Sequence, residues 1–248
     1  MYVNLKKKFG QNFLIDKNIL NKIYIEIKNN NQNILEIGPG SGSLTDFILK
    51  SNPNKLTLIE IDEDLILILK DKYKQKNIEI IHSDFLKDEK VLNHKFDLII
   101  SNLPYYISSQ ILIKICLSAN KPKRMILMFQ KEFADRLLSK KLNSLNSVIN
   151  CFFEIKKLIS VSRNSFYPIP KVNSTVLEFI ILNDYLLTDD FIIKFIKFKR
   201  DIFNKKRKTI KAVIKDYRNL GIPTQVLNQR AESLSLRELI EIFKKTNI

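Results

Sequence analysis

A glycine-rich turn at residues 35–45 is the feature that most limits what this chain can fold into. It follows an apolar segment and leads into a helical pattern. The chain has five glycines, and three of them, Gly38, Gly40 and Gly42, fall in this turn. Residues without a Cβ let the backbone approach a ligand that lies across the end of a strand, and the start of a helix offers free N–H groups. The turn therefore predicts a strand, a ligand-binding loop and a helix in succession.

Short apolar runs alternate with amphipathic ones on both sides of this turn. We expect strands at residues 33–37, 55–59, 78–81, 96–100, 124–129, 152–161 and 176–181. We expect helices at residues 17–29, 44–50, 65–72, 108–119 and 131–138. Alternating strands and helices indicate an α/β fold with a parallel sheet covered on both faces, the doubly wound, Rossmann-like class.

The pattern changes after Asn183-Asp184, where strand-like runs end. Three further helices are expected, at residues 191–200, 205–217 and 236–245. A chain of 248 residues can hold one full domain and a small appended one. We therefore predict an α/β domain at residues 1–183 and a small all-helical C-terminal domain at residues 184–248.

Two acidic residues stand at the ends of expected strands. Glu60 follows Gly38 by about 20 residues, the spacing at which an acid binds ribose hydroxyls in such folds. Asp84 ends the third strand and can accept a hydrogen bond from an adenine amino group. The alternatives are a strand-end surface acid for Glu60 and a helix cap for Asp84. These features fit any adenosine-containing cofactor, so nicotinamide adenine dinucleotide stays open at this point.

The tetrapeptide Asn102-Leu103-Pro104-Tyr105 follows the fourth of these strands. It resembles the catalytic loop of methyltransferases that modify exocyclic amino groups of adenine or cytosine. The N6 lone pair of adenine is delocalised into the ring, and the Asn102 side-chain oxygen and Leu103 carbonyl can each accept an N6–H bond and localise it. Pro104 has no N–H to compete and stiffens the turn, and Tyr105 offers a face to an unstacked base. Catalysis would be mostly positioning, with S-adenosylmethionine as methyl donor.

The net charge of +16 suggests a polyanionic partner. Nine basic residues and one acid lie between Lys194 and Lys211, and the densest part of this block is Lys205, Lys206, Arg207 and Lys208. A solvated helix face explains scattered lysines better than it explains such a block. We therefore assign Lys205–Lys208 to nucleic-acid binding.

Other classes of function are disfavoured. The apolar runs are too short to span a bilayer, and the N-terminal residues lack a secretory signal, so a cytoplasmic protein without membrane contact is expected. Cys116 and Cys151 lie in apolar contexts without metal-ligand spacing, so no metal site is expected.

Taken together, these motifs resemble the KsgA/Dim family of ribosomal RNA adenine dimethyltransferases over nearly the whole chain. Phe9-Gly10-Gln11-Asn12-Phe13-Leu14 is similar to the family's N-terminal motif, which implies that Asn12 and Leu14 contact the cofactor. The same carry-over assigns cofactor contacts to the glycine turn, Glu60, Asp84 and Asn102. The segment 165–174 resembles a downstream loop of the family, which implies that Phe166 stacks on the target adenine opposite Tyr105.

The resemblance implies a class I methyltransferase that dimethylates N6 of two adjacent adenosines near the 3′ end of small-subunit (16S) rRNA. The implied partner is small-subunit rRNA in an immature small ribosomal subunit, and we expect a monomer. The segments 203–209 and 230–236 look like the small-subunit enzyme. Tyr106 and Asn173 depart from the family pattern, which commonly has Asn and Asp at these positions.

Three alternatives remain. A macrolide-resistance enzyme that dimethylates 23S rRNA shares the fold and the cofactor motifs, but commonly has Ile where this chain has Leu103. A non-catalytic RNA-binding assembly or transcription factor could keep the fold, although the intact Asn102 and glycine turn disfavour it. An oxidoreductase would give no reason for the tetrapeptide at Asn102.

Overall fold

Seven strands form one sheet in the computed structural model, which describes residues 11–27, 32–215 and 217–246. The order across the sheet is β4-β3-β2-β5-β6-β9-β7. The strands are β2 (Asn33–Ile37), β3 (Lys55–Glu60), β4 (Ile78–His82), β5 (Leu98–Asn102), β6 (Arg124–Gln130), β7 (Phe153–Val161) and β9 (Ser174–Ile181). Each overlaps one of the seven strands expected from the sequence.

The central strands β2, β5 and β6 are mainly apolar on both faces because both faces are covered. Their interior residues are buried, whereas the edge strand β4 has partly exposed residues throughout. A continuous run of Ile and Leu is typical of a parallel strand in this position. The pairs β4–β3, β3–β2, β2–β5 and β5–β6 are parallel as expected, but β9 pairs with β6 in the antiparallel direction.

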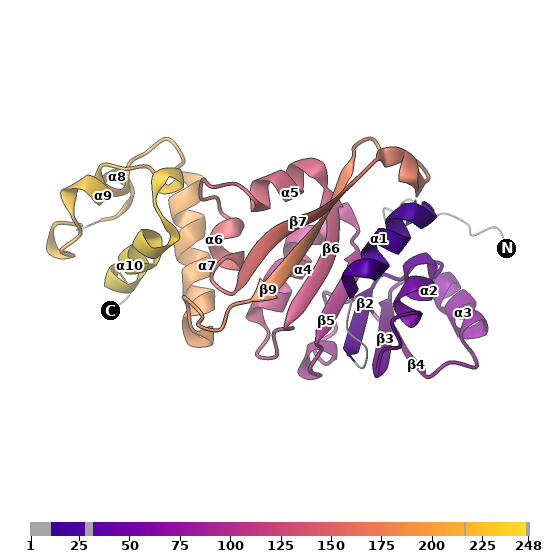
Figure 1. Cartoon of the computed structure of the whole chain (residues 1–248). Coiled ribbons are helices and arrows are strands. Elements are labelled where there is room, and N and C mark those ends of the chain that lie inside the picture. Colours follow the sequence, from indigo (N-terminus) through magenta and orange to yellow (C-terminus); the bar gives the residue numbers. More distant parts are fainter. Residues whose placement is uncertain (1–10, 28–31, 216, 247–248) are drawn as a thin grey trace. The chain divides into compact units, whose positions relative to one another are not determined.

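Helices connect the parallel strands and cover the sheet. In Figure 1, α1 lies in front of the sheet and α4 lies behind it. The helices of this part are α1 (Lys17–Ile27), α2 (Ser43–Leu49), α3 (Glu63–Lys72) and α4 (Ser108–Leu117), and α5 (Lys131–Leu137) follows β6. The last two residues of the expected helix 17–29 lie outside the described residues.

A second, two-stranded sheet pairs segments far apart in the sequence. β1 (Phe13–Leu14) pairs antiparallel with β8 (Phe166–Tyr167), with Leu14 opposite Phe166. The Ile15 backbone amide donates to the Ser165 carbonyl at 3.0 Å. The start of the described chain is therefore fixed against the loop that precedes β9.

By contact density, residues 1–134 and 155–181 form one compact unit, and residues 135–154 and 182–248 form another. The described residues of the second unit are mainly helices and turns, with the first residues of β7 and an isolated β-bridge between Thr209 and Arg230. The unit includes residues 135–154, which the sequence interpretation placed in the first domain. Its helices are α6 (Asn146–Ile149), α7 (Asp189–Asn204), α8 (Ile210–Val213), α9 (Thr224–Leu227) and α10 (Leu236–Thr246). Phe195 and Phe198 of α7 pack against Phe243 of α10, with ring centroids 5.2 and 5.4 Å apart.

The helix expected at residues 205–217 is wrong. Residues 205–208 form a turn, and among the described residues of this stretch only Ile210–Val213 are α-helical. Four consecutive cations offer no apolar side chain to pack against the unit, so no helix face could be buried there. The Thr209–Arg230 bridge that follows is an extended pairing, and it separates the turn from α8.

Candidate active site

A pocket opens at the carboxyl ends of β2, β3, β4 and β5. The strand order reverses between β2 and β5, which is where ligands bind in open α/β sheets. The predicted site residues that line this pocket are Asn12, Leu14, Gly38, Gly40, Glu60, Asp84, Asn102, Leu103, Pro104 and Tyr105. The fold therefore brings together residues from five separate segments, and their roles in binding remain predictions.

The glycine turn forms one wall of the pocket and needs glycine for two different reasons. Gly38 and Gly40 have φ values of 65° and 61°, in the left-handed region. A Cβ on Gly38 would meet no atom within 4 Å, so the missing side chain leaves open space beside the pocket. A Cβ on Gly40 would lie 2.7 Å from the ring of Phe13. The first glycine therefore leaves room for a ligand, and the second leaves room for the N-terminal segment.

Glu60 is held at the end of β3 by backbone amides. One carboxylate oxygen accepts from Gly40 at 3.1 Å, and the other accepts from Ile61 and Asp62 at 2.8 and 3.0 Å. Burial raises the pKa of Glu60, and these backbone bonds limit the rise. The oxygen that accepts from Gly40 has a second lone pair, so the group can also accept a hydroxyl hydrogen from a ribose.

Asp84 begins the loop after β4, and its carboxylate organises that loop. One oxygen accepts from the Leu86 amide at 2.9 Å. Phe85, buried beside it, also lines the pocket and offers an apolar surface to a flat ring. The loop thus pairs a hydrogen-bond acceptor with an aromatic contact, which suits an adenine.

Lys114 of α4 holds this loop in place, a role that the sequence interpretation missed. Its ammonium donates to the carbonyl oxygens of Phe85, Leu86 and Asp88 at 2.6, 3.1 and 2.5 Å. Burial lowers the pKa of Lys114, and nearby acidic groups oppose that shift. One lysine among many carries no sequence signal for this role, because the fold alone brings α4 to the loop.

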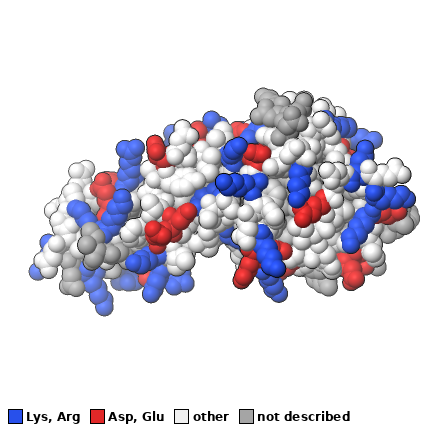
Figure 2. Space-filling view, turned by 90° about the horizontal axis from the view of Figure 1, so that it is seen from below, with Lys and Arg blue, Asp and Glu red and all other residues white. Residues whose placement is uncertain are grey.

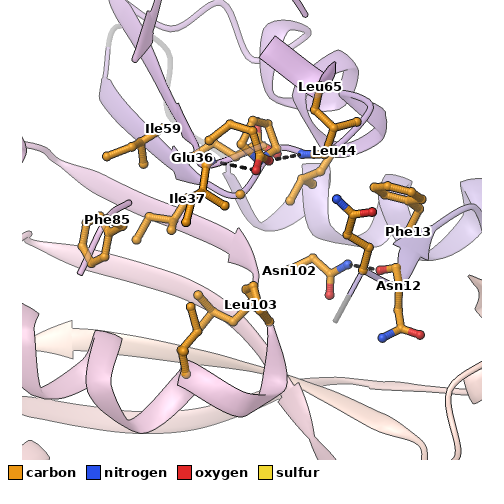
Figure 3. A pocket seen from close by; sticks show the side chains of 18 of the residues that line it. Asn12, Phe13, Glu36, Ile37, Leu44, Ile59, Leu65, Phe85, Asn102 and Leu103 are labelled. Carbon is orange, nitrogen blue, oxygen red and sulfur yellow. Dashed lines mark hydrogen bonds between the residues drawn. The ribbon is translucent and has the colours of Figure 1, made fainter. Parts of the chain in front are cut away.

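Asn102 faces the pocket with a defined orientation. Its side-chain nitrogen donates to the Asn12 carbonyl at 2.8 Å, and Figure 3 shows the side-chain oxygen pointing away from that bond. The contact identifies the donor end of the amide. The acceptor end is therefore left for a ligand, as the proposed hydrogen bond to an adenine amino group requires.

The remaining residues of the tetrapeptide support this geometry. Leu103 is buried, and Pro104 is followed by a short 3-10 helix at Tyr105–Ile107. The Tyr105 hydroxyl is 2.6 Å from the Ser174 hydroxyl at the start of β9, and burial raises the pKa of Tyr105. This bond fixes the ring at the edge of the pocket.

Tyr106 also lines the pocket, although the side chain is 60% exposed. Partial burial raises the pKa of Tyr106, and the carboxylates of Asp84 and Glu60 raise it further. Tyr106 therefore lines the same pocket as the two carboxylates that would hold an adenosine. The sequence interpretation noted Tyr106 as a departure from the family pattern and assigned it no role.

Phe166 does not line this pocket. Its side chain is 1% exposed and belongs to the hydrophobic core beside Leu14 and Met128. A base cannot stack on a ring that is covered on all sides. In this conformation Phe166 is therefore a core residue and is not available to stack on the target adenine. The exposed aromatic of β8 is its neighbour Tyr167, at 61%.

Glu36 is a second residue that the sequence interpretation missed. It lies one residue before the end of β2, is 1% exposed and accepts a 2.6 Å bond from the Thr45 hydroxyl. Burial raises its pKa to about 8, and the negative charge of Glu60 contributes. The sequence signal that could have pointed to Glu36 is an acidic residue inside an otherwise apolar strand.

The N-terminal motif is partly described. Asn12 and Leu14 lie at the pocket, and the Gln11 side chain donates to Asp62 at 2.8 Å. Phe9 and Gly10 lie outside the described residues. The structure thus places this segment over the ends of β2 and β5.

The basic block lies in the C-terminal unit, where Figure 2 shows many basic side chains projecting. Lys205, Lys206, Arg207 and Lys208 are exposed. Lys199 belongs to the same block but is buried, and its ammonium contacts the carbonyl and hydroxyl of Ser144. The exposed turn 205–208 therefore carries four of the eight exposed cations of the block.

Several other site types are not found in the part of the chain that the structure describes. No group of three or more His, Cys, Asp or Glu residues could hold a metal ion there, and no helix is long and apolar enough to cross a bilayer. Cys116 and Cys151 are buried, and burial raises the pKa of Cys151 to about 12.

Comparison with known proteins agrees with the geometry. A "Ribosomal RNA small subunit methyltransferase A" of Mycoplasma mobile is 42% identical over 239 residues, which are 94% of this chain and 92% of the relative. A dimethyladenosine transferase from Plasmodium falciparum superposes with a TM-score of 0.81 at 28% identity over 95% of this chain and 98% of that one. The 23S rRNA methyltransferase ErmE is 23% identical with a TM-score of 0.72, over 95% of this chain and all of its own (100%), and so shares the fold.

The similarity that supports a family assignment extends over nearly the whole chain. The sheet order and these structures show the class I methyltransferase fold expected from the sequence. The family model described as ribosomal RNA adenine dimethylase matches residues 2–246. The chain belongs to the ribosomal RNA adenine dimethylase family.

Proposed function

We propose that this protein transfers methyl groups from S-adenosylmethionine to N6 of two adjacent adenosines near the 3′ end of small-subunit rRNA. The observation that carries the proposal is Asn102, whose amide nitrogen is bound to the Asn12 carbonyl so that its oxygen is left for an incoming amino group. Family membership and the small-subunit relative support the choice of substrate.

The lining of the pocket fits S-adenosylmethionine. Gly38 leaves space for a ligand, Glu60 presents a carboxylate where a ribose would lie, and Asp84 with Phe85 suits an adenine. When bound, this cofactor supplies an electrophilic methyl group on a sulfonium. The chain itself needs no strong base, because the target nitrogen can lose its proton to water after transfer.

The residues of the catalytic loop would then act by positioning. Asn102 accepts one N6–H bond, the Leu103 carbonyl is proposed to accept the other, and the two together localise the nitrogen lone pair. Tyr105, fixed through Ser174, presents its ring to the base. The turn 205–208 is proposed to bind RNA phosphates, and the protein is proposed to act as a cytoplasmic monomer on immature small subunits.

The test is incubation of the protein with S-adenosylmethionine and unmethylated small ribosomal subunits, followed by mass spectrometry of the rRNA. We expect dimethyladenosine at two adjacent positions near the 3′ end, and no methylation of large subunits. The Asn102→Ala variant should lose about 100-fold in kcat or more at saturating S-adenosylmethionine, as for loss of one preorganised group. Unmodified small subunits, or methylated 23S rRNA, would contradict the proposal.

A further inference from the structure

A second hollow lies outside the cofactor pocket, and we call it the basic hollow. Its lining residues are Gln130, Lys131, Glu132, Arg163, Lys171, Val172 and Asn173. Three cations therefore face one acid, Glu132. All seven residues belong to the first compact unit, whereas the turn 205–208 belongs to the second. Neither the cofactor site nor the basic block explains this concentration of charge.

Asn173 ties together the three segments that form the basic hollow. Its backbone carbonyl accepts from the Lys131 amide at 2.9 Å, and its side-chain oxygen accepts from the Arg163 amide at 3.0 Å. One residue thus fixes the start of α5 and the short 3-10 helix at Arg163–Ser165. Because the Asn173 side chain is neutral, its bond to the Arg163 amide adds no negative charge to the hollow.

The basic hollow lies directly beside the catalytic loop. Ser174, the residue after Asn173, contacts the Tyr105 hydroxyl at 2.6 Å. In the sheet, Asn102 pairs with Met128 of β6, and Gln130 at the rim of the hollow lies two positions further along that strand. Neighbouring strands are about 4.8 Å apart. A nucleotide at Asn102 would therefore have its flanking backbone within reach of the hollow.

We propose that the basic hollow binds a backbone phosphate of the RNA strand next to the target adenosine. This inference rests on the proposed function and adds a phosphate contact to it. Guanidinium and ammonium groups are the side chains that bind phosphate oxygens, and Arg163 and Lys171 are both exposed at this site. Phosphate contacts fix the register of a nucleic acid, whereas base contacts read its identity. The hollow thus sets which adenosine reaches Asn102.

The test is a double-mutant cycle between the protein and the RNA. The probe is a small-subunit rRNA fragment with the two target adenosines, in which one phosphate at a time is replaced by an uncharged methylphosphonate. For the parent protein, one flanking linkage should weaken binding about 5- to 10-fold. For the Arg163→Gln/Lys171→Gln variant, the same replacement should cost less than about twofold, because the contact is already lost.

A matched control neutralises two exposed cations elsewhere in the same unit. Lys70 on α3 and Lys90 after β4 lie on the side of the sheet where β4 is the edge strand. The Lys70→Gln/Lys90→Gln variant should keep the full effect of the methylphosphonate. Both variants should bind S-adenosylmethionine as the parent does.

The inference is overturned if every methylphosphonate replacement weakens binding by the same factor in the parent and in the Arg163→Gln/Lys171→Gln variant. It is also overturned if the Lys70→Gln/Lys90→Gln control loses the effect of the replacement to the same extent. Binding is measured without methyl transfer. A protein that binds the fragment with this coupling but leaves small subunits unmethylated would therefore defeat the proposed function and keep the phosphate site.

Discussion

Glu36 shows how the burial of one ionisable residue makes the stability of the fold depend on pH. The folded pKa of about 8 lies above that of a carboxyl group in an unfolded chain, about 4.3. The native state therefore holds a proton that the unfolded state releases as pH rises. Glu36 stabilises the fold fully below pH 4.3, and this contribution is lost as pH rises toward 8.

We expect the free energy of unfolding of the parent chain to fall by about 1 kcal/mol per pH unit between pH 5 and 8 relative to Glu36→Gln. Glutamine keeps an acceptor for the Thr45 hydroxyl but has no proton to lose. Urea unfolding at pH 5, 6, 7 and 8 measures the difference. Glu63→Gln, an exposed residue of α3, is the control and should follow the parent at every pH. Parallel profiles for parent and Glu36→Gln would show that Glu36 is ionised throughout.

Single residues differ in how well the sequence predicts their position in the fold. The positions of Gly38, Glu60, Asp84 and Asn102 at the pocket could be predicted because each lies at or just after the end of a strand, and parallel strands end at one edge of the sheet. Phe166 could not be placed, because a phenylalanine at the base of a loop has the same local pattern whether it faces the core or a ligand. Its burial is set by the pairing of β8 with β1, which no local pattern reveals.

At the scale of elements, Lys114 links α4 to the loop after β4. We expect Lys114→Met to weaken S-adenosylmethionine binding about tenfold, because it keeps the apolar stem but removes three charged hydrogen bonds from the loop with Asp84. Calorimetry gives the affinity, and thermal unfolding gives the stability. Lys114→Arg should restore part of the affinity, and Lys90→Met, an exposed neighbour of the loop, should leave it unchanged. A loss of stability with normal affinity would limit Lys114 to a structural role.

Elements differ in how far the sequence determines them. The seven strands of the main sheet were predictable because each is rich in apolar and β-branched residues and lies between polar segments, even where charged residues interrupt it, as in β7. The antiparallel direction of β9 could not be predicted, because apolar runs look alike in either direction. β9 lies between β6 and β7 in the sheet and runs antiparallel to β6. The turn at 205–208 could not be told from a helix, because four cations are compatible with an exposed helix and the lack of a buried face becomes visible only in the fold.

At the scale of the whole molecule, the net charge of +16 predicts RNA binding that weakens steeply with salt. If the exposed turn 205–208 contacts phosphates, changing its four cations to Gln should reduce the log–log slope of affinity against salt by about 3, since each lost contact removes about 0.7 to 0.9. Filter binding to small-subunit rRNA from 50 to 300 mM salt measures the slope.

The control removes the same charge from exposed lysines elsewhere, namely Lys70, Lys76, Lys87 and Lys90. A general attraction between a basic protein and RNA depends on total charge, so it would lower the slope equally in both variants. A docked surface depends on where the charges lie, so only the variant at 205–208 should lose the slope. Equal slopes for both variants would therefore remove this turn from the interface and leave the cations of the basic hollow to hold the RNA.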